Sequence, residues 1–66
     1  MAVYKKIELV GTSDESLEAA IRTAIKKASE TLRNLDWFEV KEIRGKISDG
    51  DVQTFQVVLM VGFKID

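Results

Sequence analysis

The first segment of the chain alternates between apolar and polar side chains, which is the pattern of a half-buried β-strand. Residues 2–11 read AVYKKIELVG. The apolar residues that would share one face are Val3, Ile7 and Leu9, and the opposite face would hold Tyr4, Lys6 and Glu8. The pattern predicts a strand that ends at Gly11.

A helical period replaces this alternation from Asp14 to about Asn34. Apolar residues recur there at spacings of three and four and form one stripe, which consists of Leu17, Ile21, Ala24, Ala28, Leu32 and Leu35. The four residues TSDE, 12–15, predict a capping box, in which the Thr12 hydroxyl accepts from the amide of Glu15 and the Glu15 carboxylate reaches back. Ser13 is the alternative cap, one residue later.

A second strand is predicted from about Trp37 to Ile47, and its apolar phase is not constant. Phe38 and Val40 share one face, whereas Trp37, Ile43 and Ile47 fall on the other. Because side chains alternate strictly along a strand, this change requires a bulge, a bend, or burial of both faces. Eleven residues span roughly 36 Å, longer than so small a monomer needs, so we expect part of this strand to extend into another subunit.

The residues SDGD, 48–51, predict a hairpin turn, since Asp49 and Gly50 suit positive φ. Apolar side chains line one face of the strand that follows, namely Phe55, Val57, Leu59, Val61, Phe63 and Ile65. We expect this face to cover the helix. The opposite face holds Val52, Thr54, Gln56, Val58, Met60, Gly62 and Lys64, which is too apolar for simple exposure to water.

These elements predict one α+β domain over residues 1–66, with the order β-α-β-β. One helix would pack on one face of a three-stranded antiparallel sheet. The other face would carry Val58 and Met60, together with Trp37 and Ile43, and a single chain has nothing left to cover it. An apolar patch of this kind marks an interface or a ligand site.

The composition points to self-association. A chain of 66 residues buries only about 60 % of the surface that its unfolded form exposes, so its stability is marginal. Disulfides, a structural metal or oligomerisation usually compensate. The sequence contains no Cys and no His, which removes disulfides and the common metal ligands and leaves oligomerisation.

Charge and hydropathy argue against nucleic acid and membranes as partners. The net charge is −1, with 32 % charged and 45 % hydrophobic residues, so no global field attracts an anionic polymer or surface. No apolar run approaches the roughly 20 residues of a membrane-spanning helix. The first residues also lack the apolar core of a signal peptide. We therefore expect a cytoplasmic protein.

The side chains available for chemistry favour binding over catalysis. Without His and Cys, the commonest general base and the commonest nucleophile are missing, so we expect no enzyme and no catalytic residue. Glu39 and Glu42 would face opposite sides by alternation and would not form a carboxylate pair. Asp49 and Asp51 flank a turn glycine, where a plain turn is a simpler interpretation than a metal site.

A planar indole, a side-chain amide and a cation suit a flat heteroaromatic ligand. Trp37 would supply the stacking surface, Gln56 would read a donor–acceptor edge, and Arg44 lies in the same region. The alternative is that Trp37 is a hydrophobic anchor after the helix and that Gln56 is a strand residue in an oligomer contact.

The chain resembles the dodecin family of small flavin-binding proteins over essentially its whole length. The motifs that carry this resemblance are LVGTS (9–13), LDWFEV (35–40), IRG (43–45), FQV (55–57) and VGF (61–63). The resemblance implies a hollow homododecamer that binds flavins in pairs between tryptophans of neighbouring subunits. It implies that Trp37 stacks on the flavin and that Gln56 bonds to the isoalloxazine edge. Glu42 would lie near the ribityl chain and Arg44 near the flavin, whereas Lys64 replaces an Arg that is common in relatives.

The implied function is storage and photoprotection of riboflavin or FMN, with fluorescence quenched by the stacked indole. Some members of the family also bind coenzyme A. Two other functions stay open at this point. One is a shell or assembly protein in which Trp37 and Gln56 serve only packing, and the other is a redox enzyme that uses a bound flavin.

Overall fold

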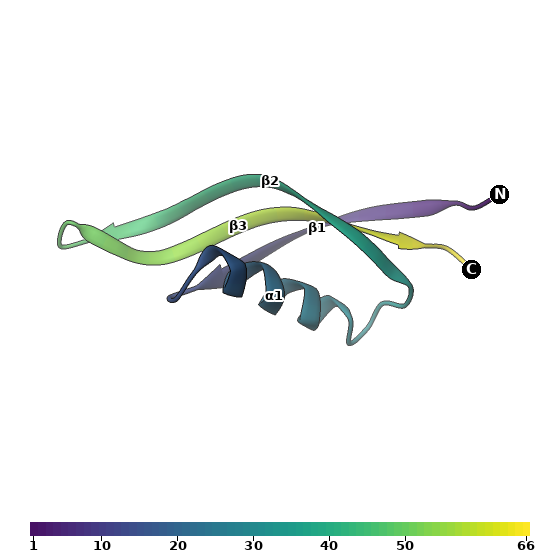
Figure 1. The fold of residues 1–66 in the computed structure, drawn as a ribbon, viewed down its shortest axis with the longest axis horizontal. Coiled ribbons are helices and arrows are strands. Elements are labelled where there is room, and N and C mark those ends of the chain that lie inside the picture. The colour runs from purple at the N-terminus through teal and green to yellow at the C-terminus, as the bar shows by residue number, and fades with distance from the viewer.

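The computed structural model describes all residues from Met1 to Asp66 and contains three strands and one helix. Their order is β1 (Tyr4–Ser13), α1 (Leu17–Ala28), β2 (Leu35–Ser48) and β3 (Asp51–Lys64). The sheet has the order β1-β3-β2 and both of its pairings are antiparallel, so β3 lies in the centre. Helix α1 covers one face, and the β2–β3 hairpin extends beyond the helix (Figure 1). The predicted β-α-β-β fold is confirmed.

The core forms where small helix residues meet the central strand. Its buried members are Ala20, Ala24, Val57, Leu59 and Val61. Half-buried apolar residues pack around them, namely Ile7, Leu9, Leu17, Ile21, Ile25 and Leu35. The predicted apolar face of β3 therefore does face the helix. Alanines on α1 let the helix approach the sheet closely, and so does Gly11 on β1.

The predicted start of the helix is wrong. Strand β1 continues past Gly11 to Ser13, where Thr12 pairs with Gln56 and Ser13 with Phe55. Neither residue caps the helix, because both belong to β1 and α1 begins only at Leu17. The Ser13 hydroxyl instead accepts from the amide of Glu15 at 2.9 Å in the turn that follows. Ser16 is the cap, and its hydroxyl accepts from the amide of Ala19 at 3.0 Å.

We expect Ser16→Ala to lower the free energy of unfolding by about 1 kcal/mol, because the amide of Ala19 loses its partner at the helix start. Urea unfolding followed by far-UV circular dichroism measures the change. All variants must be compared at one chain concentration, since stability depends on it in an oligomer. Thr12→Ala is the matched control and should change stability by less than about 0.5 kcal/mol. An equal loss in both variants would contradict the assignment of the cap.

The helix also ends earlier than predicted, at Ala28 rather than near Asn34. Ser29 caps it through its backbone N–H, which donates to the carbonyls of Ile25 and Lys27. The connection to β2 ends at Asn34, whose φ of 64° lies in the left-handed region. The Asn34 side chain donates to Asp66 at 2.9 Å, and the Asn34 backbone carbonyl accepts from the amide of Lys64. These bonds tie the residues before Trp37 to the end of the chain.

Strand β2 contains the irregularities that its apolar phase predicted. The register against β3 shifts between Leu35 and Trp37, between Val40 and Glu42, and between Lys46 and Ile47. At the second shift Lys41 is an extra residue, so the side chains after it change faces. Ile43 consequently pairs with Val57 and lies on the helix side of the sheet. Its predicted place beside Trp37 is wrong for this reason. The turn is as predicted, with φ of 53° at Asp49 and 76° at Gly50.

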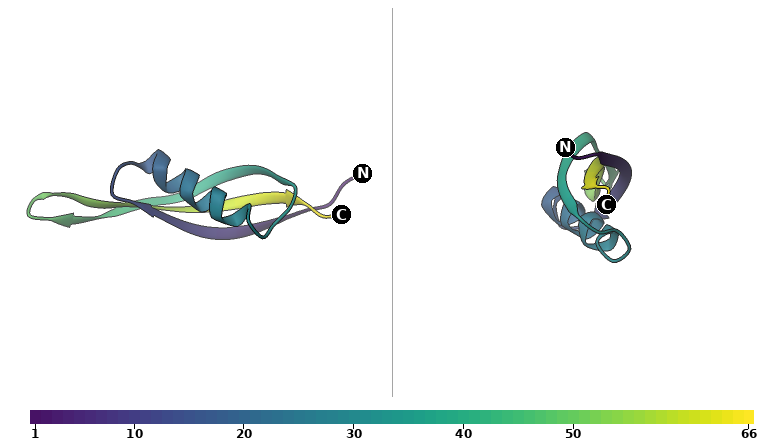
Figure 2. Two further views of the ribbon diagram at one scale, coloured as in Figure 1. Left: turned by 90° about the horizontal axis from the view of Figure 1, so that it is seen from below. Right: turned by 90° about the vertical axis from the view of Figure 1, so that its right-hand side faces the viewer.

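Most of the sheet beyond the helix is exposed in the single chain. The molecule measures 51 × 20 × 13 Å, and only 9 of 66 residues are buried (Figure 2). Every residue of β2 after Leu35 is exposed. Large exposed apolar side chains include Phe38, Val40, Ile43, Ile47 and Val52. One chain therefore leaves much apolar surface in contact with water, which is unfavourable for an isolated monomer.

Candidate functional site

The candidate residues lie on the face of the sheet that turns away from α1, which we call the open face. Residues that pair directly across an antiparallel sheet point to the same side. Val57, Leu59 and Val61 point to the helix, so the residues between them point away. The pairings then define the open face as Tyr4, Lys6, Glu8, Val10 and Thr12 of β1, Trp37, Glu39, Glu42 and Arg44 of β2, and Gln56, Val58, Met60, Gly62 and Lys64 of β3. All four predicted binding residues are among them.

Trp37 lies across the central strand at one end of the open face. It pairs with Gly62, and its indole covers that glycine, since a Cβ built on Gly62 would be 2.4 Å from Trp37 Cε2. Tyr4 of β1 meets the indole from the other side of β3, with ring centroids 5.3 Å apart and the planes inclined by 56°. Trp37 keeps 39 % of its surface exposed. Its ring is thus held on one side and accessible on the other.

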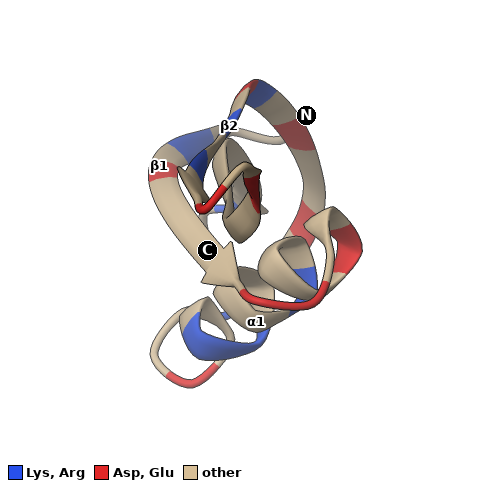
Figure 3. Cartoon of the chain, turned by 90° about the vertical axis from the view of Figure 1, so that its left-hand side faces the viewer, with Lys and Arg blue, Asp and Glu red and all other residues tan.

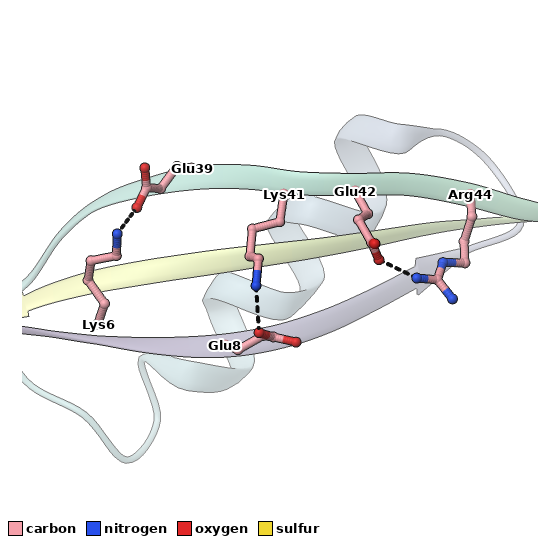
Figure 4. A network of polar contacts seen from close by, with 6 residues as sticks. All are labelled: Lys6, Glu8, Glu39, Lys41, Glu42 and Arg44. Atoms are coloured by element: carbon pink, nitrogen blue, oxygen red, sulfur yellow. Dashed lines mark hydrogen bonds and ion pairs between the residues drawn. The ribbon is translucent and has the colours of Figure 1, made fainter.

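Gln56, Arg44 and Glu42 lie together near the other end of the open face. Arg44 pairs directly with Gln56 across β2 and β3, and Thr12 pairs with Gln56 on the β1 side. Arg44 also forms an ion pair with Glu42 (Figure 4). A small hollow beside them has no apolar residue in its lining, which comes from Thr12, Gly45, Lys46, Thr54 and Gln56. This end of the face therefore offers donors and acceptors for a polar ligand edge.

The two ends are too far apart for one ligand to touch both in a single chain. Trp37 is level with Gly62 and Arg44 is level with Gln56, and these two β3 residues are six positions apart. At about 3.3 Å per residue this separation is roughly 20 Å. The structure thus brings Gln56, Arg44 and Glu42 together and leaves Trp37 at a distance. A site that uses all four needs residues from two chains.

Charged side chains of β1 and β2 form ion pairs across the open face. Lys41 contacts Glu8 at 3.1 Å, and Lys6 pairs with Glu39, so both bridges pass over β3 (Figure 4). Glu39 pairs with Met60 and Glu42 with Val58 in the sheet, so both carboxylates share one face. The prediction that they face opposite sides is wrong, because the extra residue Lys41 restores their phase. Each carboxylate nevertheless has its own cation, which leaves no free acid pair.

Acidic and basic residues are interspersed over the whole chain and not gathered into a field of one sign (Figure 3). No group of three or more acidic side chains lies close enough together to hold a metal ion. The only helix, α1, is too short to cross a membrane. The open face is therefore the most distinctive feature of the molecular surface.

Two residues of the Trp37 end were not among the predicted site residues. The alternating pattern placed Tyr4 on one face of the first strand and gave it no role. Gly62 was named only as one member of the second face of β3. A glycine inside an otherwise regular strand often marks a close approach of another group, which was the available signal. No signal in the sequence pointed to the contact of Tyr4 with Trp37.

Fold and open face together define a class of protein: a small α+β module with an exposed tryptophan on an unpartnered sheet. Comparison with known proteins identifies the family. The dodecin family model matches residues 3–66, and a curated dodecin from Thermus thermophilus is 64% identical over 64 residues, covering 97% of this chain and 93% of that protein. The chain belongs to the dodecin family.

Solved structures and a more distant relative agree with this assignment. A T. thermophilus dodecin variant in which a tryptophan is replaced by phenylalanine matches with a TM-score of 0.95 and 61% identity, covering 100% of this chain and 98% of that one. The dodecin of Streptomyces davaonensis matches with a TM-score of 0.93 and 49% identity over 98% and 96%. A protein of Mycobacterium tuberculosis named calcium dodecin is 31% identical over 65 residues, which are 98% of this chain and 92% of that protein.

Proposed function

We propose that this protein binds flavin for storage and sequestration, holding riboflavin or FMN in pairs between the Trp37 side chains of two subunits. The observation that carries the proposal is the setting of Trp37. Its indole is supported by Gly62 and Tyr4 on one side and is 39 % exposed. A flat aromatic surface of this kind suits stacking with a planar heterocycle. Membership of the dodecin family adds support.

The proposal requires an assembly, and the single chain supports one. Only 9 of 66 residues are buried, and β2 exposes apolar side chains along its length. A two-fold axis brings the same patch of two chains together, so one Trp37 per chain yields a pair of facing indoles. The same axis can place Gln56 of one chain near Trp37 of the other, which resolves their separation of roughly 20 Å within a chain. We propose the homododecamer of the family as the complete assembly.

Each residue of the open face has a distinct part in this proposal. Trp37 stacks on the ring system and quenches the photoexcited flavin by reversible electron donation, which suppresses its photochemistry. The Gln56 amide can donate and accept, and so matches the alternating donors and acceptors of the isoalloxazine edge. Glu42 can accept from ribityl hydroxyls. Arg44 can donate to a sugar or phosphate oxygen, although its charge is already partly balanced by Glu42.

A fluorescence titration of the apo protein with riboflavin and with FMN tests the function. We expect saturable quenching near one flavin per chain. Trp37→Ala should weaken binding roughly tenfold to hundredfold, since stacking on an aromatic side chain contributes about 1–3 kcal/mol per base. Trp37→Phe should retain part of the affinity while quenching less, because phenylalanine is the poorer electron donor.

Thr31→Ala is the control, since Thr31 is exposed and lies in the connection between α1 and β2, away from the open face. Sedimentation must show the same assembly for all variants. If neither flavin is quenched by an intact wild-type assembly, the flavin function is wrong, and Trp37 and Gln56 serve packing alone.

A further inference from the structure

The indole of Trp37 lies face-on over Gly62. A Cβ built on this glycine would be 2.4, 2.4 and 2.5 Å from Cε2, Cζ2 and Cη2 of the ring. These atoms are consecutive in the six-membered ring. An approach from the ring edge would leave the middle atom clearly nearer than its two neighbours. The nearly equal distances therefore place the missing Cβ beneath the ring face.

Gly62 is buried, and the nearest atoms above it belong to the indole. It lies in the central strand with Lys6 paired on one side and Trp37 on the other. The Trp37 side chain reaches over β3 from β2 and meets the Tyr4 ring of β1, at the centroid distance of 5.3 Å. Backbone thus supports one face of the indole, and an aromatic ring limits its sliding. Trp37 nevertheless keeps 39 % of its surface exposed, so the ring is not enclosed.

We propose that Gly62 and Tyr4 are positioning residues that hold the Trp37 indole parallel to the sheet for a planar heteroaromatic ligand. The proposal rests on the proposed function and adds residues to that same site. Carbon atoms in contact need about 3.5–4.0 Å, so a methyl group at Gly62 would push the ring outward by about 1 Å or more. In a stacked pair on a two-fold axis, both indoles would be displaced, and the space between them would no longer match two parallel ligands.

A double-mutant cycle separates this role from a general need for glycine at position 62. The four proteins are wild type, Gly62→Ala, Trp37→Ala and the double variant. We expect Gly62→Ala to weaken riboflavin and FMN binding by about tenfold, which corresponds to about 1.4 kcal/mol. In the Trp37→Ala background, Gly62→Ala should have no further effect on flavin binding or on the midpoint of urea unfolding, because there is no ring to displace.

The apo protein gives a readout that does not depend on ligand. Trp37 is the only Trp, so its near-UV circular dichroism and its emission maximum report on one side chain. Gly62→Ala should reduce the near-UV signal and shift the emission to longer wavelength, with unchanged far-UV signal and assembly. Tyr4→Leu should produce a smaller change in the same direction, and Tyr4→Phe should behave like wild type since it keeps the ring.

The outcomes distinguish the two proposals. If wild type binds flavin, Trp37→Ala binds it more weakly, and Gly62→Ala binds like wild type with an unchanged Trp37 spectrum, then the positioning role is wrong and the function stands. If Gly62→Ala destabilises the protein equally with and without Trp37, the glycine serves the backbone and the positioning role is again wrong. If wild type binds no flavin, the proposed function fails, and this proposal fails with it.

Discussion

Mixing a Trp37→Ala chain with a Gln56→Ala chain should restore flavin quenching that neither variant shows by itself. In one chain Trp37 is level with Gly62, six positions along β3 from Gln56, a separation of roughly 20 Å. No three-ring heterocycle can stack on Trp37 and bond to Gln56 of the same chain across that distance. The proposed site must therefore take its tryptophan and its amide from different chains.

The restored fraction can be calculated for a symmetric contact. In the proposed arrangement, two equivalent sites lie at each two-fold contact, and each takes Trp37 from one chain and Gln56 from the other. In a contact between unlike variants, one site has lost both residues and the other has kept both. Random mixing makes half of the contacts unlike, so about a quarter of all sites should be intact.

The experiment unfolds both variants together in urea, refolds the mixture and titrates it with FMN at a concentration that saturates only wild-type sites. Each variant refolded alone is the first control. Gln56→Ala alone should bind FMN about tenfold or more weakly than wild type, because the polar edge of the ligand loses its partner. A mixture of Trp37→Ala with Thr31→Ala chains is the second control. If the mixture of the two site variants quenches no more than each alone, the proposed division of the site between chains is wrong.

The regular parts of this fold could be predicted because each follows from local pattern. Unbroken alternation from Phe55 to Ile65 indicates β3 and its helix-facing side, and Asp49-Gly50 indicates the turn. The helix was overextended because the apolar spacing continues through Leu32 and Leu35. Leu35 does pack against the core, but it does so from the start of β2. The apolar spacing therefore continues beyond the end of the helix.

The bulge at Lys41 explains most of what could not be predicted at the open face. A broken apolar phase shows that an irregularity exists, but not which residue is the extra one. Counting from Trp37 without the bulge placed Ile43 on the open face and separated Glu39 from Glu42. The pairings reverse both placements. Residue chemistry suggested Trp37 and Gln56 as candidates, and the resemblance to the dodecin family gave their roles and added Glu42. The separation of Trp37 from Gln56 and the support of Trp37 by Gly62 needed the register.

Gly11→Ala should be the most destabilising single-methyl change in this protein. A Cβ at Gly11 would be 2.2 Å from the carbonyl oxygen of Ala20 and 3.0 Å from the Ala24 Cβ. The nearest atom belongs to the helix backbone, so no side-chain rotation can relieve the clash. A carbon–oxygen contact needs nearly the same separation as a carbon–carbon contact. Helix α1 would therefore have to move away from β1 by more than about 1 Å.

That movement would open the contact of Ala20 and Ala24 with Val57 and Leu59, which is the buried core of the chain. Overpacking typically costs about 1–3 kcal/mol, and we expect this clash to lie at the upper end because it is with the backbone of the helix. The single chain has little stability to lose, since a domain of 66 residues is marginal by itself. We expect far-UV circular dichroism at one chain concentration to show a much lower urea midpoint, or no folded state.

Gly50→Ala is the matched control. It adds the same methyl group at a position where the backbone conformation, and not a steric clash, disfavours alanine. Gly50 has φ of 76° and nothing within 4 Å of an added Cβ. Gly11 is not among the residues with positive φ, so alanine meets only the clash there. A left-handed conformation costs a non-glycine residue about 1–2 kcal/mol. If Gly11→Ala cost no more than Gly50→Ala, α1 would not lie as close to β1 as the core requires, and the seating of the helix on the sheet would be wrong.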